Sequence, residues 1–254
     1  MALLFDDSTG DGQLLNVDSA VVTATPYTIH CWFNSDNDSI DQYPLAVGDK
    51  DVADDFAGIQ LRGSQGGDYV AVFSYSGAFR MAVSAKGYVP GQWHSATAVF
   101  ASDSSRKIYL DGAVPVENTQ AQVVQNIDRT RIGRSPDRTD SLTGEFSGSI
   151  AETAIWDVAL TDREVQQLHI GFSPPYLTGL LPHLKLYKSL RRFINGPDDI
   201  GPDMQAWSND ELTTRTELAV SNHPPNIIDP PEPWNMASVS QSPSQHHQHA
   251  VALK

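Results

Sequence analysis

Apolar and polar residues alternate along most of the first 170 residues, which is the pattern of half-buried β-strands. The clearest alternating run is His94–Phe100, and a second run, Lys107–Leu110, follows a polar link. Asp111 and Gly112 come next and suit a two-residue hairpin turn, because both central positions of a type I′ turn need a positive φ. Ala113–Val116 then leads away as a return strand. This stretch predicts three antiparallel strands in a meander.

Further alternating runs predict a chain composed mainly of strands. Tyr27–Phe33 is the most strongly strand-forming run, and its alternation places Tyr27 and Cys31 on one face and Trp32 on the other. The last long strand is expected to pair near the N-terminal one. The other predicted strands are Ala2–Phe5, Leu14–Val22, Leu45–Gly48, Phe56–Leu61, Tyr69–Tyr75, Phe79–Val83, Val123–Ile127, Thr130–Gly133 and Phe146–Trp156, with Asn34–Tyr43 and Asp49–Asp55 as loops.

One helix is predicted after the last long strand. Thr161 and Glu164 form a capping box, in which the Thr hydroxyl caps the third helical N–H and the Glu side chain reaches back. Val165 and Leu168 then face inward at helical spacing. Gly171 ends the helix, and two prolines follow. Many strands with a single short helix predict an all-β domain.

Two sequence motifs resemble a known family. Trp93 opens a strand, and Tyr109–Gly112 ends the next strand with Tyr-Leu-Asp-Gly. A second match begins at Phe146–Glu152 and continues through Ile155-Trp156 to Ala159–Thr161. These motifs resemble the laminin-G-like domains of the concanavalin A-like lectin and glucanase superfamily. The resemblance implies a two-sheet antiparallel jelly-roll sandwich.

The resemblance covers roughly Ala2 to Gln167, and the chain divides accordingly. We expect a jelly-roll sandwich over residues 1–171. Residues 172–229 are expected to form an extended, largely irregular C-terminal segment that packs on the sandwich or on a neighbour. Residues 230–254 form a Pro/Ser/Gln/His-rich tail of the kind that is usually disordered.

The C-terminal segment combines apolar and basic residues and has little periodicity. Leu180–Arg192 and Ser221–Ile228 resemble an extension found in laminin-G-like proteins of tailed phages. We expect the sandwich to fold alone and Phe172–Lys254 to supply attachment or inter-subunit contacts, although the segment could instead wrap its own sandwich. The candidate attachment residues are Lys185, Lys188, Arg191 and Arg192.

Composition limits the partners. The 254 residues carry a formal net charge of −14 and the sequence pI is about 4.7. This balance argues against nucleic acid, because binding to its backbone depends on clustered Lys and Arg. The single cysteine, Cys31, allows no intrachain disulfide and fits folding in a reducing cytoplasm. No signal peptide is evident and no apolar run approaches the roughly 20 residues that span a bilayer, so we expect no membrane partner.

An acidic loop is the best metal candidate. Calcium takes oxygen ligands, which clustered carboxylates and loop carbonyls supply. The resemblance also implies this cation, since some laminin-G-like domains hold calcium at the sandwich rim. The alternative is an ordinary solvated acidic loop, and no other cofactor is predicted. The candidate ligands are Asp49, Asp51, Asp54 and Asp55.

Catalysis is not predicted. Retaining glycosidases need two carboxylates about 5–5.5 Å apart, which on one strand means acidic residues two apart on one face. The chain has no such glycosidase run, and Glu145 and Glu152 are seven apart, hence on opposite faces of a continuous strand. Motifs for nucleophilic serine, zinc hydrolase and phosphate-binding sites are also missing. The sequence therefore predicts a non-enzymatic protein.

Two functions fit these features. The first is a virion structural protein of a tailed phage, with capsid decoration favoured over another exposed head or tail module. Such a protein is made in the host cytoplasm, assembles as a homo-oligomer, expected to be a trimer, and binds other virion proteins such as the major capsid protein. The alternative is a lectin-like adhesion module, calcium-dependent or not, that binds cell-surface glycans. Its candidate stacking residues are Trp32, Tyr75 and Trp93, although Trp32 and Trp93 also suit buried positions.

Overall fold

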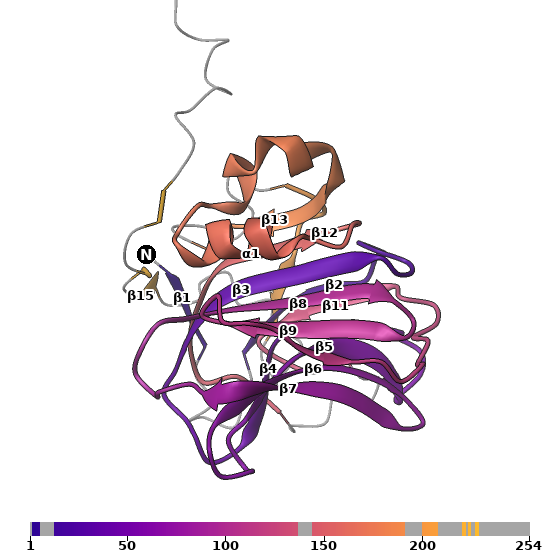
Figure 1. Ribbon diagram of the computed structural model, residues 1–254, viewed down its shortest axis with the longest axis horizontal. Helices are drawn as coiled ribbons and strands as arrows, with labels where there is room; N and C mark the ends of the chain where they lie inside the picture. Colours follow the sequence, from indigo (N-terminus) through magenta and orange to yellow (C-terminus); the bar gives the residue numbers. More distant parts are fainter. Residues whose placement is uncertain are drawn as a thin grey trace, which may run out of the picture.

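The computed structural model describes residues 2–5, 13–136, 144–190, 200–207, 220–221, 223–224 and 227–228. Within these residues the chain forms two antiparallel β-sheets packed face to face (Figure 1). A short helix and two 3-10 turns lie over one of the sheets. The predicted all-β sandwich with one short helix is confirmed.

Sheet A contains eight strands among the residues that the structure describes. One of them, β13 (Leu184–Lys188), lies outside the main row of strands. It pairs with the second half of β12, whereas β1 pairs with the first half. The other strands of sheet A, in spatial order, are β10 (Val116–Asn118), β9 (Ser105–Leu110), β8 (His94–Ser102), β3 (Tyr27–Ser35), β12 (Gly148–Trp156), β1 (Ala2–Phe5) and β15 (Val220–Ser221).

Sheet B contains seven strands within the described part of the chain, and β7 is its edge strand. In spatial order the strands are β14 (Gln205–Trp207), β2 (Leu14–Val17), β11 (Arg129–Ile132), β4 (Asp41–Gly48), β5 (Asp55–Arg62), β6 (Tyr69–Ser76) and β7 (Phe79–Gly87).

The main core lies between the two sheets, where the alternation predicted it. Tyr27 and Cys31 of β3 are buried there, opposite Ile59 of β5. Burial raises the pKa of the Cys31 thiol. The predicted hairpin is also present, since φ is 52° at Asp111 and 62° at Gly112. The meander of β8, β9 and β10 is therefore confirmed.

Several predicted boundaries are wrong, and one predicted strand is missing. Among the described residues Val123–Ile127 pairs with no neighbouring strand, and Gln125 N–H donates instead to a side chain, Asp55 Oδ2 at the start of β5, at 3.1 Å. β2 ends at Val17, and β10 begins only at Val116. The predicted loop Asn34–Tyr43 is shorter than expected, since β3 extends into it to Ser35 and β4 begins already at Asp41.

The outer face of sheet A is covered by local segments (Figure 1). Helix α1 (Asp162–His169) carries the predicted capping box, with Thr161 N–H donating to Glu164 Oε2 at 2.7 Å. Its Val165 and Leu168 pack against a second apolar cluster around Trp156. The 3-10 turns η1 (Pro174–Tyr176) and η2 (Thr178–His183) lead from α1 into β13.

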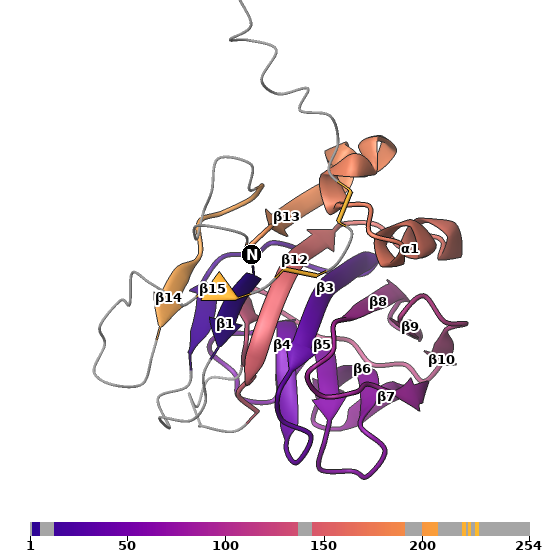
Figure 2. The same cartoon turned by 90° about the vertical axis from the view of Figure 1, so that its left-hand side faces the viewer.

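The described parts of the C-terminal segment pack on the sandwich itself (Figure 2). β13 pairs with β12 from Thr153 to Trp156, directly after β1 has paired with the beginning of the same strand. At this junction Glu152 has a φ of +52° and lies in a bulge. No helix among the described residues is long and apolar enough to cross a bilayer. The predicted tail, residues 230–254, lies outside the described residues.

Candidate functional site

An aromatic cluster lies on the outer face of sheet B. Because Ala57, Ile59 and Leu61 of β5 point into the core, the alternate residues of that strand point outward. The same alternation turns Phe73 and Tyr75 of β6 outward, while Val70 and Val72 face the core. The outward rings form one contiguous group, which we call the sheet B cluster: Tyr43, Phe56, Phe73, Tyr75 and Phe79.

The rings of this cluster are buried at its centre and become exposed toward the edge strand β7. Phe73 lies at its centre, with ring centroids 5.4 Å from Phe56 and 5.5 Å from Tyr43, both edge to face. Tyr75 and Phe79 are stacked at 4.3 Å across the β6–β7 pair. Phe79 is 41% exposed on the edge strand. Aromatic surface is therefore available to a ligand at the β7 side of the sheet.

Polar groups border the aromatic cluster. Gln60 Nε2 donates to Tyr43 Oη at 3.1 Å and to Asp41 Oδ2 at 3.2 Å. Two buried polar atoms there have no hydrogen-bond partner among the described residues, namely Gln60 Oε1 and Arg62 Nε. Such groups are costly to bury unpaired, and because both atoms are buried, their hydrogen bonding is completed only by a water molecule or by a movement of the side chain.

The three aromatic residues predicted to bind sugar do not lie together on one surface. Tyr75 belongs to the sheet B cluster. Trp32 lies on the outer face of sheet A, is only 7% exposed, and is stacked 6.3 Å from His169 of α1. Trp93 packs into the same small cluster as Trp32. Trp32 is therefore not the exposed aromatic residue that was expected, because α1 covers its face of the sheet.

Sequence reasoning missed four members of the sheet B cluster. The signal for Phe73 was present, because it shares the alternation of Tyr75 within one strand. Phe56 and Phe79 are the cross-strand partners of Tyr75, so their proximity depends on strand register, which the sequence leaves open. Tyr43 lay in a stretch predicted as a loop.

The acidic loop brings together part of the predicted metal set. Carboxylate oxygens of Asp49, Asp51 and Asp128 lie within 4.8 Å of one another. This donor set fits calcium, which prefers oxygen ligands. However, Lys50 Nζ lies 2.5 Å from Asp51 and 3.1 Å from Asp128, and so already neutralises part of the charge. Sequence reasoning missed Asp128, which reaches the loop from the segment before β11.

The remaining predicted ligands lie elsewhere. Asp55 accepts a hydrogen bond from Gln125 N–H, and burial raises the pKa of its carboxyl group. Asp54 is exposed and is not part of the three-carboxylate group. The cluster that the structure supports as a cation site is therefore Asp49, Asp51 and Asp128.

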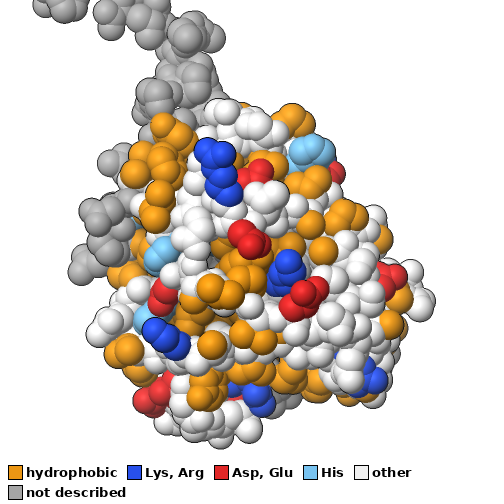
Figure 3. Space-filling model, viewed as in Figure 1, with side chains coloured by type: hydrophobic (Ala, Val, Ile, Leu, Met, Phe, Trp, Pro, Cys, Tyr) orange, Lys and Arg blue, Asp and Glu red, His pale blue; other side chains and the backbone are white. Residues whose placement is uncertain are grey.

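The predicted attachment residues do not form one surface. Lys185 Nζ pairs with Asp157 Oδ2 at 2.9 Å. Lys188 is only 1% exposed, so it cannot present its charge to a partner, because β13 lies within sheet A. Arg191 and Arg192 lie outside the described residues. On the face seen in Figure 3, basic and acidic side chains are interspersed.

The two carboxylates considered for catalysis are nearly fully buried. Glu145 lies 3.8 Å from Arg134 Nη1, and Glu152 accepts a hydrogen bond from Tyr187 at 2.9 Å. Both carboxylates are therefore engaged within the protein rather than open to a substrate.

The comparisons with known proteins agree with this architecture. A family model described as the concanavalin A-like lectin/glucanases superfamily matches residues 7–166. The chain belongs to this superfamily. The resemblance predicted from the strand motifs is therefore confirmed. A comparison with curated protein sequences finds no match.

Solved structures share the fold at low sequence identity. A pentraxin from Limulus polyphemus is 12% identical with a TM-score of 0.53, over 66% of this chain and 80% of that chain. Domain 4 of the arabinanase AbnA from Geobacillus stearothermophilus, solved with arabinotriose, is 19% identical with a TM-score of 0.52, over 61% and 71%. A putative carbohydrate-binding protein from Bacteroides ovatus is 17% identical with a TM-score of 0.53, over 82% of this chain and 57% of that chain.

Proposed function

We propose that this protein is a non-catalytic carbohydrate-binding module whose glycan lies across the outer face of sheet B. The observation that carries this proposal is the contiguous sheet B cluster, whose Tyr75–Phe79 stack reaches an exposed Phe79 on the edge strand. α1, η1 and η2 all lie over sheet A and leave this aromatic surface accessible at Phe79.

The chemistry of the face suits a sugar. Pyranose and furanose rings have an apolar C–H face that packs on aromatic side chains, and the Tyr75–Phe79 stack offers such a surface. Sugar hydroxyl groups donate and accept hydrogen bonds, and the half-buried polar side chains of Asp41 and Arg62 lie at the other end of the face. A few convergent polar groups beside apolar surface are the usual composition of small-ligand sites.

Similar structures support a binding role. The arabinanase domain was solved with a bound arabinotriose, and the Bacteroides protein is described as carbohydrate-binding. At these identities the likeness shows only the fold. The virion role, the trimer, the capsid partner and the cytoplasmic synthesis expected from the sequence stay predictions.

A glycan array with the intact protein tests the proposal, run in calcium and again in a chelator. We expect binding to a defined set of neutral or acidic glycans, and we expect Phe79→Ala to weaken every positive signal. Ile170→Ala is a matched control, because Ile170 is an exposed apolar residue at the end of α1 over the opposite sheet. An array without any binding, in both conditions, would rule out this function.

A further inference from the structure

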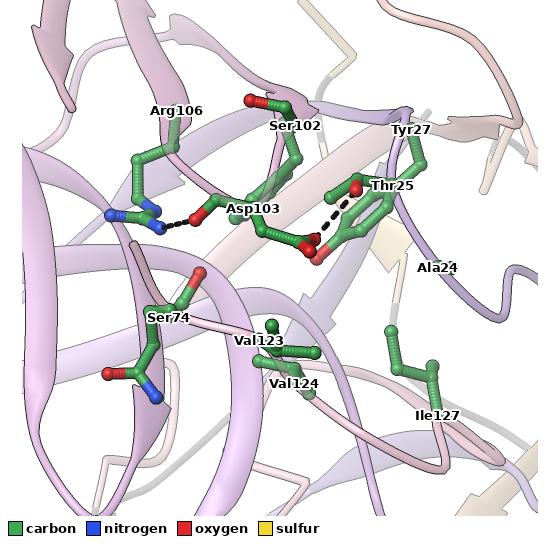
Figure 4. A pocket seen from close by; sticks show the side chains of 12 residues that line it. Ala24, Thr25, Tyr27, Ser74, Ser102, Asp103, Arg106, Val123, Val124 and Ile127 are labelled. Carbon is green, nitrogen blue, oxygen red and sulfur yellow. Dashed lines mark hydrogen bonds between the residues drawn. The ribbon is translucent and has the colours of Figure 1, made fainter. Parts of the chain in front are cut away.

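A cavity of about 210 Å³ lies between the two sheets, on the side of β6 opposite the sheet B cluster, and Figure 4 shows side chains that line it. Residues from both sheets line it: Ser74 of β6 points inward there, whereas its neighbours Phe73 and Tyr75 point outward. The volume is below the roughly 300–1,000 Å³ of pockets for drug-sized molecules. The cavity therefore suits a ligand no larger than a single sugar ring.

The most unusual residue of this cavity is Arg106, which is 1% exposed. Its guanidinium donates only to neutral acceptors: Asn118 Oδ1 at 2.6 Å, Gln120 O at 2.8 Å and Asp103 O at 2.9 Å. Among the described residues Arg106 forms no ion pair with a carboxylate, and its Nε has no hydrogen-bond partner. Burial lowers the pKa of Arg106, and the Asp103 carboxylate at the mouth of the cavity offsets this effect only in part.

A buried cation without a paired anion favours an anionic ligand. Carboxylates match a guanidinium both in charge and in planar geometry, and the reduced solvent screening inside the sandwich strengthens the attraction. The rest of the lining offers hydroxyl groups from Tyr27, Ser74 and Ser102. Burial raises the pKa of Tyr27, so its phenol stays neutral and can donate a hydrogen bond.

The mouth of the cavity is both polar and apolar. Asp103 lies there, exposed, and accepts a hydrogen bond from Thr25 Oγ1 at 2.8 Å, as Figure 4 shows. Carboxylates of this kind accept hydrogen bonds from the hydroxyl groups of a ligand. Val123 and Val124 provide an apolar wall opposite.

We propose that this cavity binds a sugar acid of monosaccharide size, with its carboxylate directed to Arg106. Its hydroxyl groups bind Asp103 and the cavity hydroxyls, and its carbon skeleton packs on the two valines. The cavity opens to solvent at Asp103, so the sugar acid is either free or the terminal residue of an acidic glycan. This site is separate from the sheet B cluster and does not depend on the function proposed for that face.

The test is a titration of the intact protein with D-glucuronate, with D-glucose, and with a disaccharide that ends in glucuronate, followed by calorimetry or by NMR. We expect glucuronate to bind at least about tenfold more tightly than glucose, because glucose lacks the carboxylate. Tighter binding of the disaccharide than of free glucuronate assigns the site to glycan ends, and the reverse assigns it to free sugar acids.

Two kinds of variant locate the binding. Arg106→Gln should weaken glucuronate binding at least about tenfold while leaving glucose unchanged. Since that buried change can also impair folding, Val123→Phe serves as a second variant that fills the cavity mouth from a half-exposed position. Val114→Phe is its matched control, because Val114 is 87% exposed and does not line the cavity.

Three results would overturn the proposal: no saturable binding of glucuronate to the wild type, equal affinity for glucose and glucuronate, or unchanged glucuronate binding in Val123→Phe. Tyr75→Ala changes the sheet B cluster and not the cavity lining, so it should leave glucuronate binding intact. The two proposed sites can therefore be tested independently of each other.

Discussion

At the residue scale, His30 has the clearest consequence for stability. Its ring is fully buried on the outer face of sheet A, with Nδ1 2.9 Å from Thr97 Oγ1. Nε2 has no partner among the described residues. Burial lowers the pKa of His30 to about 3; the backbone of Ala96 opposes this shift, and the charge of His169 adds slightly to it. The folded state therefore holds His30 neutral under conditions in which the unfolded chain protonates it.

This lowered pKa predicts a loss of stability in mild acid. Between about pH 6.5 and pH 3 the unfolded state binds one more proton at His30, so the free energy of unfolding falls by about 1.4 kcal/mol per pH unit. Urea unfolding should give a free energy of unfolding that is about 2 kcal/mol lower at about pH 5 than at about pH 7.5 because of this group. The His30→Gln variant should lose less stability over the same change of pH. An equal pH dependence in both proteins would show that His30 does not cause it.

Lys50 is the second residue with a testable role. Its ammonium group lies between Asp51 and Asp128, which also lie close to Asp49. Lys50→Gln should leave three carboxylates facing one another, so the Tm should fall in chelator and recover in millimolar calcium. Wild type should respond less to calcium, because Lys50 competes for two of the three carboxylates. If neither protein responds, the acidic loop is simply solvated.

At the element scale, Glu152 joins the C-terminal segment to the sandwich. Its carboxylate is fully buried, accepts a hydrogen bond from Tyr187 of β13, and lies 3.1 Å from His223 Nε2. The backbone at this position has a positive φ in the bulge between the stretches that pair with β1 and β13. One residue thus connects β12, β13 and the segment after β15.

Loss of this connection should be costly. His223→Ala leaves the buried Glu152 carboxylate with one partner fewer and should lower the free energy of unfolding by about 1–3 kcal/mol in urea. His183→Ala is the matched control, because His183 pairs with Asp157 at the surface and should cost about 0–1 kcal/mol. Equal effects of the two substitutions would contradict a structural role for Glu152.

Local elements were predictable, whereas long-range ones were not. The Asp111-Gly112 turn and the α1 capping box follow from neighbouring residues, and both are present. Val123–Ile127 has an apolar pattern typical of a strand, but its residues close the end of the sandwich. The proximity of Asp128 to Asp49 depends on how distant loops meet, which no local pattern encodes.

At the scale of the whole molecule, residues after Gly171 complete sheet A. β13 pairs with β12, and its Leu184 and Tyr187 pack with Trp156 and Leu160 in the second apolar cluster. The sequence predicted that residues 1–171 fold alone, because they contain a capped helix, a closing strand and enough alternating strands for two packed faces. The structure instead gives part of that segment a place in the sheet.

Truncation after Gly171 should therefore damage the fold. It removes β13 and uncovers Trp156, which is fully buried in the intact chain. We expect an aggregating or loosened product that binds a hydrophobic dye, because a large apolar surface becomes exposed. Solubility, dye fluorescence and the melting curve measure this outcome. A soluble truncated monomer with the wild-type Tm would restore the original prediction.

The central claim is that a glycan binds the outer face of sheet B, and amide chemical-shift mapping by NMR with a glycan identified on the array tests it most directly. We predict that the shifted amides cluster on β5, β6 and β7, and that Tyr75→Ala and Phe79→Ala weaken binding at least about tenfold while Ile170→Ala does not. Shifts confined to α1 and sheet A, with unchanged affinity in Phe79→Ala, would contradict the account.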